Sequence, residues 1–155
     1  MLQVKYIFDS NVFITLQQRQ PIDLYPSVWE KVGNLMEAGT IISSQEVLDE
    51  ILAGNDELAS WAKMRSECFV PTLEEIQLEA RCILKEYRGL VEGGKKKNTA
   101  DPFVIAIAKI SAASVVTEEG RTNNLNSPKI PDVCSELAIP CINFVAFARE
   151  MKFSF

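Results

Sequence analysis

The residues best suited to chemistry in this sequence are acids that stand where one predicted element ends and another begins. Asp101 opens a segment whose residues, from Phe103 to Ile110, are small or apolar nearly all round. This pattern predicts a buried helix, and a carboxylate at its start lies at the positive end of the helix dipole. Capping a helix is the ordinary role of such an acid, so Asp101 alone would not indicate a functional site.

Two further acids follow short apolar runs of strand character. Asp9 comes directly after Val4–Phe8, and Glu119 follows Ser114–Thr117. In open parallel α/β folds, ligands bind at the carboxyl edge of the sheet, where both acids are expected. Glu118 competes with Glu119 for this position, although the residue directly after the strand more often faces away.

A fourth acid is expected from the helix that follows the strand around Ile41 and Ile42. Val47, Leu48, Ile51 and Leu52 form its apolar face. Glu46 and Glu50 are four residues apart and share another stripe of the same helix. The sequence alone does not decide which of these two glutamates faces the sheet edge.

Acids that converge on one edge repel each other unless cations lie between them. The chain contains no histidine, which excludes an imidazole base or metal ligand. Oxygen-only ligands suit the hard cations Mg²⁺ and Mn²⁺ better than zinc. In sites with two such ions, roughly 3.5–4 Å apart, one activates a water and the other stabilises the leaving oxygen of a phosphodiester.

The order of the predicted elements determines the expected fold. Strand patterns alternate with helical patterns, which predicts a three-layer α/β/α fold with a central, mostly parallel sheet. Strands are expected near residues 4–8, 40–44, 114–117 and 141–142. The segment from Asn55 to Arg88 lacks a strong strand pattern and is expected to form a helical arm. Within it, Thr72 to Glu75 matches a capping box.

Composition indicates one domain spanning residues 1–155. The chain is 47% hydrophobic and 24% charged, which excludes a disordered chain. No apolar run approaches the roughly 20 residues that span a bilayer, and no secretory signal is present. The cysteines are dispersed, which favours buried thiols in a reducing cytoplasm over a zinc site. They are Cys68, Cys82, Cys134 and Cys141.

Four motifs taken in order resemble the PIN-domain ribonucleases over most of the chain. The matching segments are Asp9-Ser10-Asn11, Val47-Leu48-Asp49-Glu50-Ile51, Asp101-Pro102-Phe103-Val104-Ile105-Ala106 and Thr117-Glu118-Glu119, the last with Glu in place of the usual Asp. The segment from Lys129 to Cys134 is similar to a prokaryotic branch that includes toxin-like proteins.

The resemblance implies Mg²⁺- or Mn²⁺-dependent cleavage of single-stranded RNA that leaves a 5′-phosphate. The implied metal-binding catalytic residues are Asp9, Glu50, Asp101 and Glu119. Ser10, Asn11 and Thr117 would orient these ligands or bound water. The resemblance further implies that the chain could be a toxin paired with a small antitoxin protein, and it is compatible with a homodimer.

A second segment with a possible function precedes Asp101. Gly93 and Gly94 are followed by Lys95, Lys96 and Lys97, whose ammonium groups could bind the RNA backbone. A solvated surface loop is an equally good interpretation. The formal net charge of −5 argues against broad, nonspecific binding of nucleic acid.

Two alternatives compete with a nuclease. A haloacid-dehalogenase-like phosphatase also begins with a strand that ends in Asp, but it needs a second Asp where this chain has Asn11. The other alternative is a catalytically degenerate PIN scaffold that binds RNA or a protein partner without cleaving it. The replacement of Asp by Glu119 keeps this alternative open.

Overall fold

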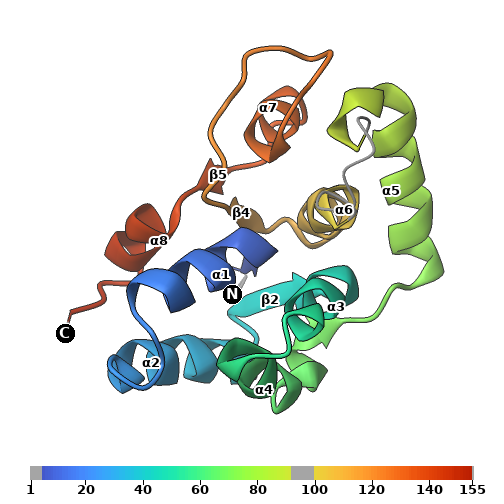
Figure 1. Ribbon diagram of the computed structural model, residues 1–155. Helices are drawn as coiled ribbons and strands as arrows, with labels where there is room; N and C mark the ends of the chain where they lie inside the picture. Colours follow the sequence, from blue (N-terminus) through green and yellow to red (C-terminus); the bar gives the residue numbers. More distant parts are fainter. Residues whose placement is uncertain (1–4, 92–99, 155) are drawn as a thin grey trace.

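The computed structural model describes residues 5–91 and 100–154 and shows a five-stranded sheet surrounded by helices (Figure 1). The strands are β1 Tyr6–Phe8, β2 Ile41–Ser44, β3 Phe69–Val70, β4 Ser114–Val116 and β5 Cys141–Ile142. The helices are α1 Ser10–Arg19, α2 Pro26–Glu37, α3 Gln45–Ala53, α4 Glu57–Lys63, α5 Glu74–Glu86, α6 Asp101–Ser111, α7 Ile130–Glu136 and α8 Phe144–Glu150. Two short 3₁₀ turns are η1 Ser66–Cys68 and η2 Arg88–Leu90.

The strands lie in the order β3-β2-β1-β4-β5, and every neighbouring pair is parallel. β1 is central, with Phe8 paired to Val116 of β4. The backbone N–H of Asp9 donates to the carbonyl of Val116 over 3.0 Å, so the two strands end at the same level. The segments that follow β1 and β4 therefore begin side by side at the carboxyl edge of the sheet.

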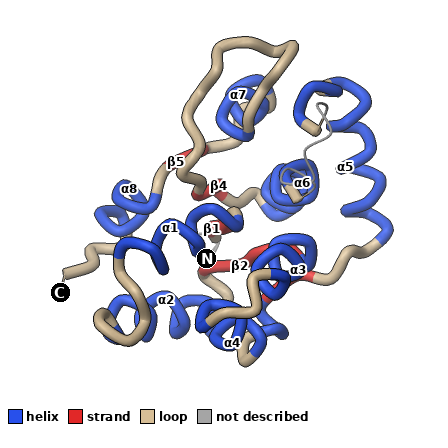
Figure 2. Tube along the Cα trace, in the orientation of Figure 1, coloured by secondary structure: helices blue, strands red, loops and turns tan. Residues whose placement is uncertain are grey.

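Helices cover both faces of the sheet, as the tube view shows (Figure 2). On one face, Phe8 packs its ring against Phe13 of α1 and against Phe144 and Phe147 of α8. On the other, α6 contacts β1, β2 and β4, with α5 packed along α6. The predicted three-layer α/β/α fold with a parallel sheet is confirmed.

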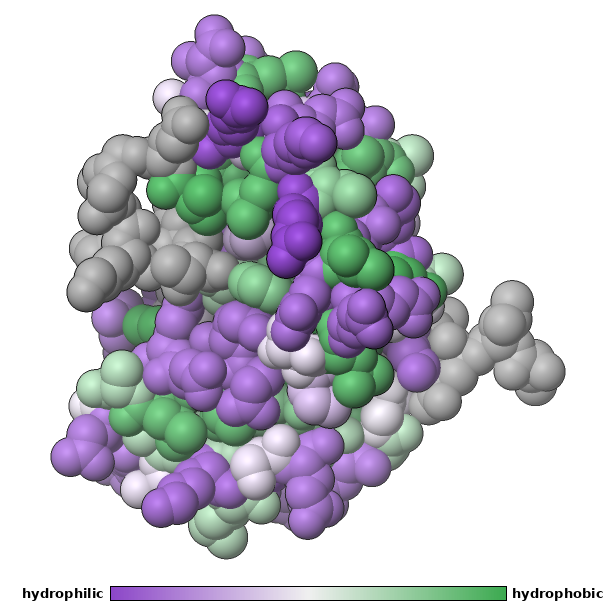
Figure 3. Space-filling model, turned by 90° about the vertical axis from the view of Figure 1, so that its right-hand side faces the viewer, coloured by the Kyte–Doolittle hydropathy of each residue, from purple (hydrophilic) through white to green (hydrophobic). Residues whose placement is uncertain are grey.

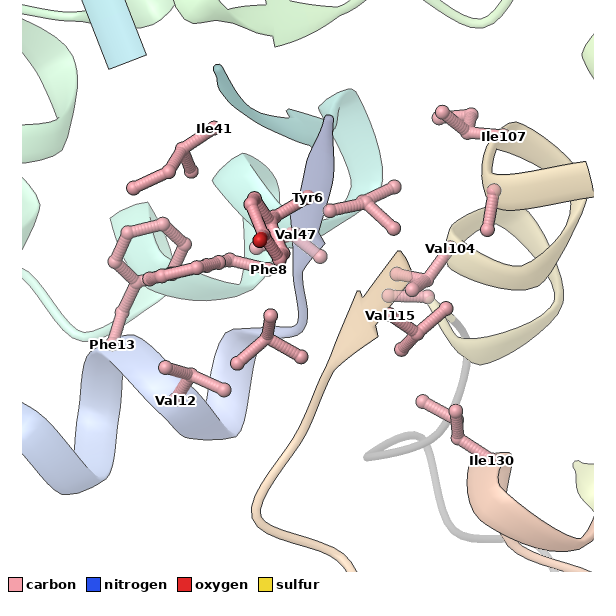
Figure 4. Close-up of a cluster of buried hydrophobic side chains, with 14 of the residues drawn as sticks. Tyr6, Phe8, Val12, Phe13, Ile41, Val47, Val104, Ile107, Val115 and Ile130 are labelled. Carbon is pink, nitrogen blue, oxygen red and sulfur yellow. The ribbon is translucent and has the colours of Figure 1, made fainter. Parts of the chain in front are cut away.

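The core explains why the sheet edge is rigid. Phe8, Val12 and Phe13 of the β1–α1 junction have almost no exposed surface, and neither do Val104 of α6 and Val115 of β4 (Figure 4). Fully burying an apolar side chain of this size contributes about 1.5–3 kcal/mol before entropy is counted. The acids next to these residues are consequently held on closely packed backbone.

The outer surface differs from this core. On the side that carries α5, hydrophilic and hydrophobic residues are intermixed (Figure 3). Among residues 5–91 and 100–154, no helix is both long enough and apolar enough to cross a membrane.

Three expectations about local structure were wrong. The segment from Asn55 to Arg88 does contain a strand, β3, which pairs with β2, and its long helix α5 packs on α6 instead of forming an arm. Thr72 does not cap α5: its hydroxyl donates to a carboxylate oxygen of Glu46, and α5 begins after Leu73. All four cysteines are free, but Cys82 is exposed and only Cys134 is fully buried.

Candidate metal centre

Three of the four predicted acids converge at the carboxyl edge of the sheet. Asp9 follows β1, Glu119 comes from the segment after β4, and Asp101 is the first residue of α6. One carboxylate oxygen from each lies within 4.8 Å of the others. We call Asp9, Asp101 and Glu119 the carboxylate cluster.

Asp9 is the most constrained acid of the cluster, with 2% of its surface exposed. Its Oδ1 accepts a hydrogen bond from the Ser10 N–H over 2.8 Å, which caps α1. Its Oδ2 accepts from the Thr117 hydroxyl over 3.1 Å. Burial, followed by the charge of Glu119, raises the pKa of Asp9 to about 7 in spite of these two donors.

Asp101 is nearly as buried, with 4% exposed. Pro102 follows it in the first turn of α6, where the missing N–H of proline costs nothing. Burial and the charges of Asp9, Glu119 and Glu50 raise the pKa of Asp101 to about 9, and the charge of Lys129 acts in the opposite direction. Burial and the neighbouring acids therefore favour the protonated form of Asp101 when no cation is bound.

Glu119 reaches the cluster although its side chain is longer than the Asp usual at this position of the family pattern. Its Oε2 accepts a hydrogen bond from the Ile130 N–H over 3.2 Å, at the start of α7. Burial raises the pKa of Glu119, while Ile130 and Lys129 oppose the rise. Glu118, which directly follows Thr117, is exposed and lies outside the cluster. This agrees with the expectation that it faces away from the site.

Glu50 lies near the cluster but not within it. Burial and the charge of Glu119 raise the pKa of Glu50, and hydrogen bonds from the Ser10 side chain and the Ala100 backbone lower it. Its Oε1 is buried and has no hydrogen-bond partner among the described residues. Glu46 is held elsewhere by Thr72, so Glu50 is the glutamate of α3 that faces the site.

The three polar residues predicted to support the site form one network. The Thr117 hydroxyl contacts Asp9, and Asn11 Nδ2 lies 3.2 Å from the same hydroxyl oxygen. Asn11 Oδ1 also accepts from the Glu118 N–H over 3.0 Å, which ties α1 to the segment after β4. Together with Ser10, these contacts fix where Asp9 and Glu119 lie relative to each other.

Asp132 is a buried acid near Glu119 that the sequence analysis did not single out. It is buried on α7 and accepts from the backbone N–H groups of Thr122, Asn123 and Lys129, at 3.0, 3.0 and 2.8 Å, and from the Thr122 hydroxyl at 2.8 Å. Burial raises its pKa, but these donors outweigh burial and hold the pKa below its ordinary value. Asp132 lies three residues after the N-cap residue Lys129, which is the spacing of the acid in a capping box. This spacing is the sequence signal that could have identified Asp132.

Lys95, Lys96 and Lys97 lie outside the described residues, so their expected contact with RNA stays a prediction. The carboxylate cluster, with Glu50 beside it, is the part of the described chain that could hold a divalent cation.

The fold and the acids at its edge define an α/β protein with a carboxylate cluster at the carboxyl edge of a parallel sheet. The chain belongs to a family described as a domain of unknown function (DUF4411), whose sequence profile matches residues 6–155. No curated protein sequence matches the chain.

Among solved structures, the chain is similar to VapBC2 from Rickettsia felis, crystallised bound to a DNA fragment from their promoter. The two chains are 15% identical with a TM-score of 0.51, and the match covers 91% of this chain and 99% of that one. At this identity the likeness supports the fold, and function has to be inferred from the carboxylate cluster.

Proposed function

We propose that this protein is a metal-dependent ribonuclease that cleaves phosphodiester bonds of single-stranded RNA. The observation that carries the proposal is the convergence of Asp9, Asp101 and Glu119, from three separate elements, within 4.8 Å of one another. Burying three acids together is costly for an isolated protein, since their pKa values must rise. A bound divalent cation would offset this cost.

The residues present suit Mg²⁺ or Mn²⁺. All the candidate ligands are carboxylate oxygens, which hard cations prefer. Glu50 Oε1 is buried without a hydrogen-bond partner among the described residues, and an incoming cation or its water would satisfy it. Among the described residues, no Lys or Arg forms an ion pair with the carboxylate cluster. The ion pair found there joins Lys109 to Glu79, away from the site.

The chain's own residues would bind the cation and orient its ligands. Asp9, Asp101 and Glu119 would bind the cation, with Glu50 contacting it directly or through water. When bound, the cation lowers the pKa of an attacking water and neutralises charge on the phosphate. Thr117 and Asn11 would keep Asp9 in place, and Ile130 would hold one oxygen of Glu119 so that the other stays available.

RNA as the substrate, and a 5′-phosphate on the product, are supported by the resemblance of the four motifs to PIN-domain ribonucleases. The PIN-like fold supports the same class. The likeness to VapBC2 also supports a second part of the proposal, in which the chain is a toxin that binds a small antitoxin protein.

A cleavage assay tests the activity. The parent protein should cut labelled single-stranded RNA only when Mg²⁺ or Mn²⁺ is added, and Asp101→Asn should be inactive. Asp49→Asn is a matched control, because Asp49 is exposed on α3 and its carboxylate accepts a hydrogen bond from Gln45, away from the cluster. Cleavage that survives in Asp101→Asn, or that proceeds fully in EDTA, would reject the proposed chemistry.

Binding of RNA without cleavage in the parent would instead favour the degenerate scaffold. The antitoxin is tested by expressing the chain with and without any small reading frame found next to its gene. Growth arrest that this neighbour relieves, in a complex that co-purifies, is the expected result. Unrestricted growth with the chain alone would count against a toxin.

A further inference from the structure

A groove of about 470 Å³ runs along α1 on the side of the sheet that carries α8. Val12, Thr15, Leu16 and Arg19 line it from α1, at the spacing of one helix face. Phe144 lines it from α8, opposite α1. The groove thus joins two helices that are far apart in sequence but pack against the same strand, β1.

One end of this groove lies beside the carboxylate cluster. Glu118 lines it there, and the Glu118 N–H donates to Asn11, which also contacts Thr117. Asp9 caps the helix that forms the groove wall. Because a helix rises about 1.5 Å per residue, the ten residues of α1 carry the wall roughly 15 Å away from the cluster.

The far end of the groove is basic and aromatic. Arg19 in the last turn of α1 and Arg149 in the last turn of α8 both line it with exposed side chains. Neither arginine forms an ion pair with a described carboxylate, although the chain has a net charge of −5. Tyr25 lies at the same end and is 43% exposed.

These features match the parts of single-stranded nucleic acid. The planar, always-charged guanidinium group of arginine binds phosphate through paired hydrogen bonds. An exposed aromatic ring offers a stacking surface for a base of any identity. An apolar floor, here Val12 and Leu16, suits the faces of bases better than their charged backbone.

We propose that the groove binds the stretch of the RNA substrate next to the cleaved phosphodiester, with Arg19 and Arg149 on phosphates and Tyr25 stacked on a base. This inference rests on the proposed ribonuclease function. An acidic amphipathic helix of a protein could also lie between α1 and α8. The RNA strand is favoured because Glu118, which lines one end of the groove, directly precedes Glu119 of the carboxylate cluster, where the phosphodiester would lie.

Binding is measured by fluorescence anisotropy of a labelled single-stranded RNA, in an Asp9→Asn background so that cleavage does not interfere. Arg19→Ala with Arg149→Ala should weaken binding at least tenfold. Because each arginine neutralises one phosphate of a single strand, the slope of log affinity against log salt should become shallower by about 1.4. The matched control, Lys63→Ala with Arg81→Ala, removes two exposed cations that do not line the groove and should keep the parent slope.

Tyr25 separates stacking from charge. Tyr25→Ala should weaken RNA binding about tenfold with an unchanged salt slope, whereas Tyr25→Phe should bind like the parent. In the cleaving protein, Tyr25→Ala and the Arg19→Ala, Arg149→Ala double variant should lower single-turnover rates at subsaturating RNA and leave the saturating rate unchanged. Circular dichroism melting of each variant checks that the fold is kept.

The outcomes distinguish this proposal from the proposed function. Groove variants that bind RNA with the parent affinity and salt slope overturn the proposal, even if the parent cleaves RNA. The same result combined with lost binding of a co-expressed antitoxin would assign the groove to a protein partner instead. If the parent binds RNA through the groove but never cleaves it, the groove proposal stands and the nuclease proposal fails.

Discussion

Asp101 and Asp132 are both buried acids, yet their surroundings are opposite. Asp132 receives hydrogen bonds from three backbone N–H groups and one hydroxyl, and its pKa is lowered. Asp101 has no described side-chain hydrogen bond and faces other acids, and its pKa rises to about 9.

This difference separates a structural acid from a ligand-binding one. A buried carboxylate surrounded by donors is already satisfied by the protein. A buried carboxylate surrounded by carboxylates is satisfied only by protons or by a cation. Substitutions at the two kinds of acid should therefore have opposite consequences for stability.

The largest expected effect is on catalysis by Asp9→Asn. Losing a ligand of the proposed cation, which would neutralise the phosphate, should cost several kcal/mol of transition-state stabilisation, or roughly a 10³-fold loss of cleavage rate. Above pH 7, however, the same change removes a charge from the crowded site and should raise the metal-free melting temperature. A variant that loses activity and is also destabilised in EDTA at pH 8.5 would show that Asp9 is mainly structural.

The opposite behaviour is expected for Asp132→Ala. The loss removes the shared charged acceptor of three backbone N–H groups and one hydroxyl and should cost about 3 kcal/mol of unfolding free energy. For a chain of this size the melting temperature should fall by about 6–12 °C, with or without metal, in a thermal unfolding experiment. Asp23→Ala, at an exposed turn position, is the matched control. An unchanged melting temperature in Asp132→Ala would contradict the structural role.

A further effect is expected from pH. The ordinary pKa of Asp is 3.8, and in the folded protein it rises to about 7 for Asp9 and about 9 for Asp101. Between about pH 4 and about pH 9 the folded state therefore binds more protons than the unfolded state. The free energy of unfolding of the metal-free protein should consequently fall as pH rises through this range. Urea unfolding in EDTA at several pH values measures this slope, and Asp9→Asn should flatten it. A stability that increases across this range would be inconsistent with the crowded cluster.

The sequence predicted those features that depend on local pattern. Apolar runs ending in acids gave β1 with Asp9 and β4 with Glu119, and the apolar helix after Asp101 gave α6. Asn143, a residue type that favours helix starts, likewise caps α8 and accepts from the Ala146 N–H over 2.9 Å. These features rest on neighbouring residues, so one sequence is enough to find them.

The features that were missed depend on distant contacts. β3 has only two residues, and its pairing with β2 makes it a strand. Thr72 was assigned to a cap because its contact with Glu46, 26 residues earlier, cannot be read from local sequence. Likewise, the choice of Glu50 over Glu46 is made by the packing of α3 against Ser10 and Ala100.

The central claim, that the carboxylate cluster binds a divalent cation, is tested most directly by a Mn²⁺ titration of the metal-free protein followed by thermal unfolding. A cation that binds only the folded state at 100 times its Kd stabilises it by about 2.7 kcal/mol. The melting temperature of the parent should therefore rise by about 5–11 °C. The melting temperature of Asp132→Asn should be lower without metal and should rise by a similar amount. Asp101→Asn should show little rise. No Mn²⁺-dependent rise in the parent up to millimolar concentrations, or an equal rise in Asp101→Asn, would contradict the account.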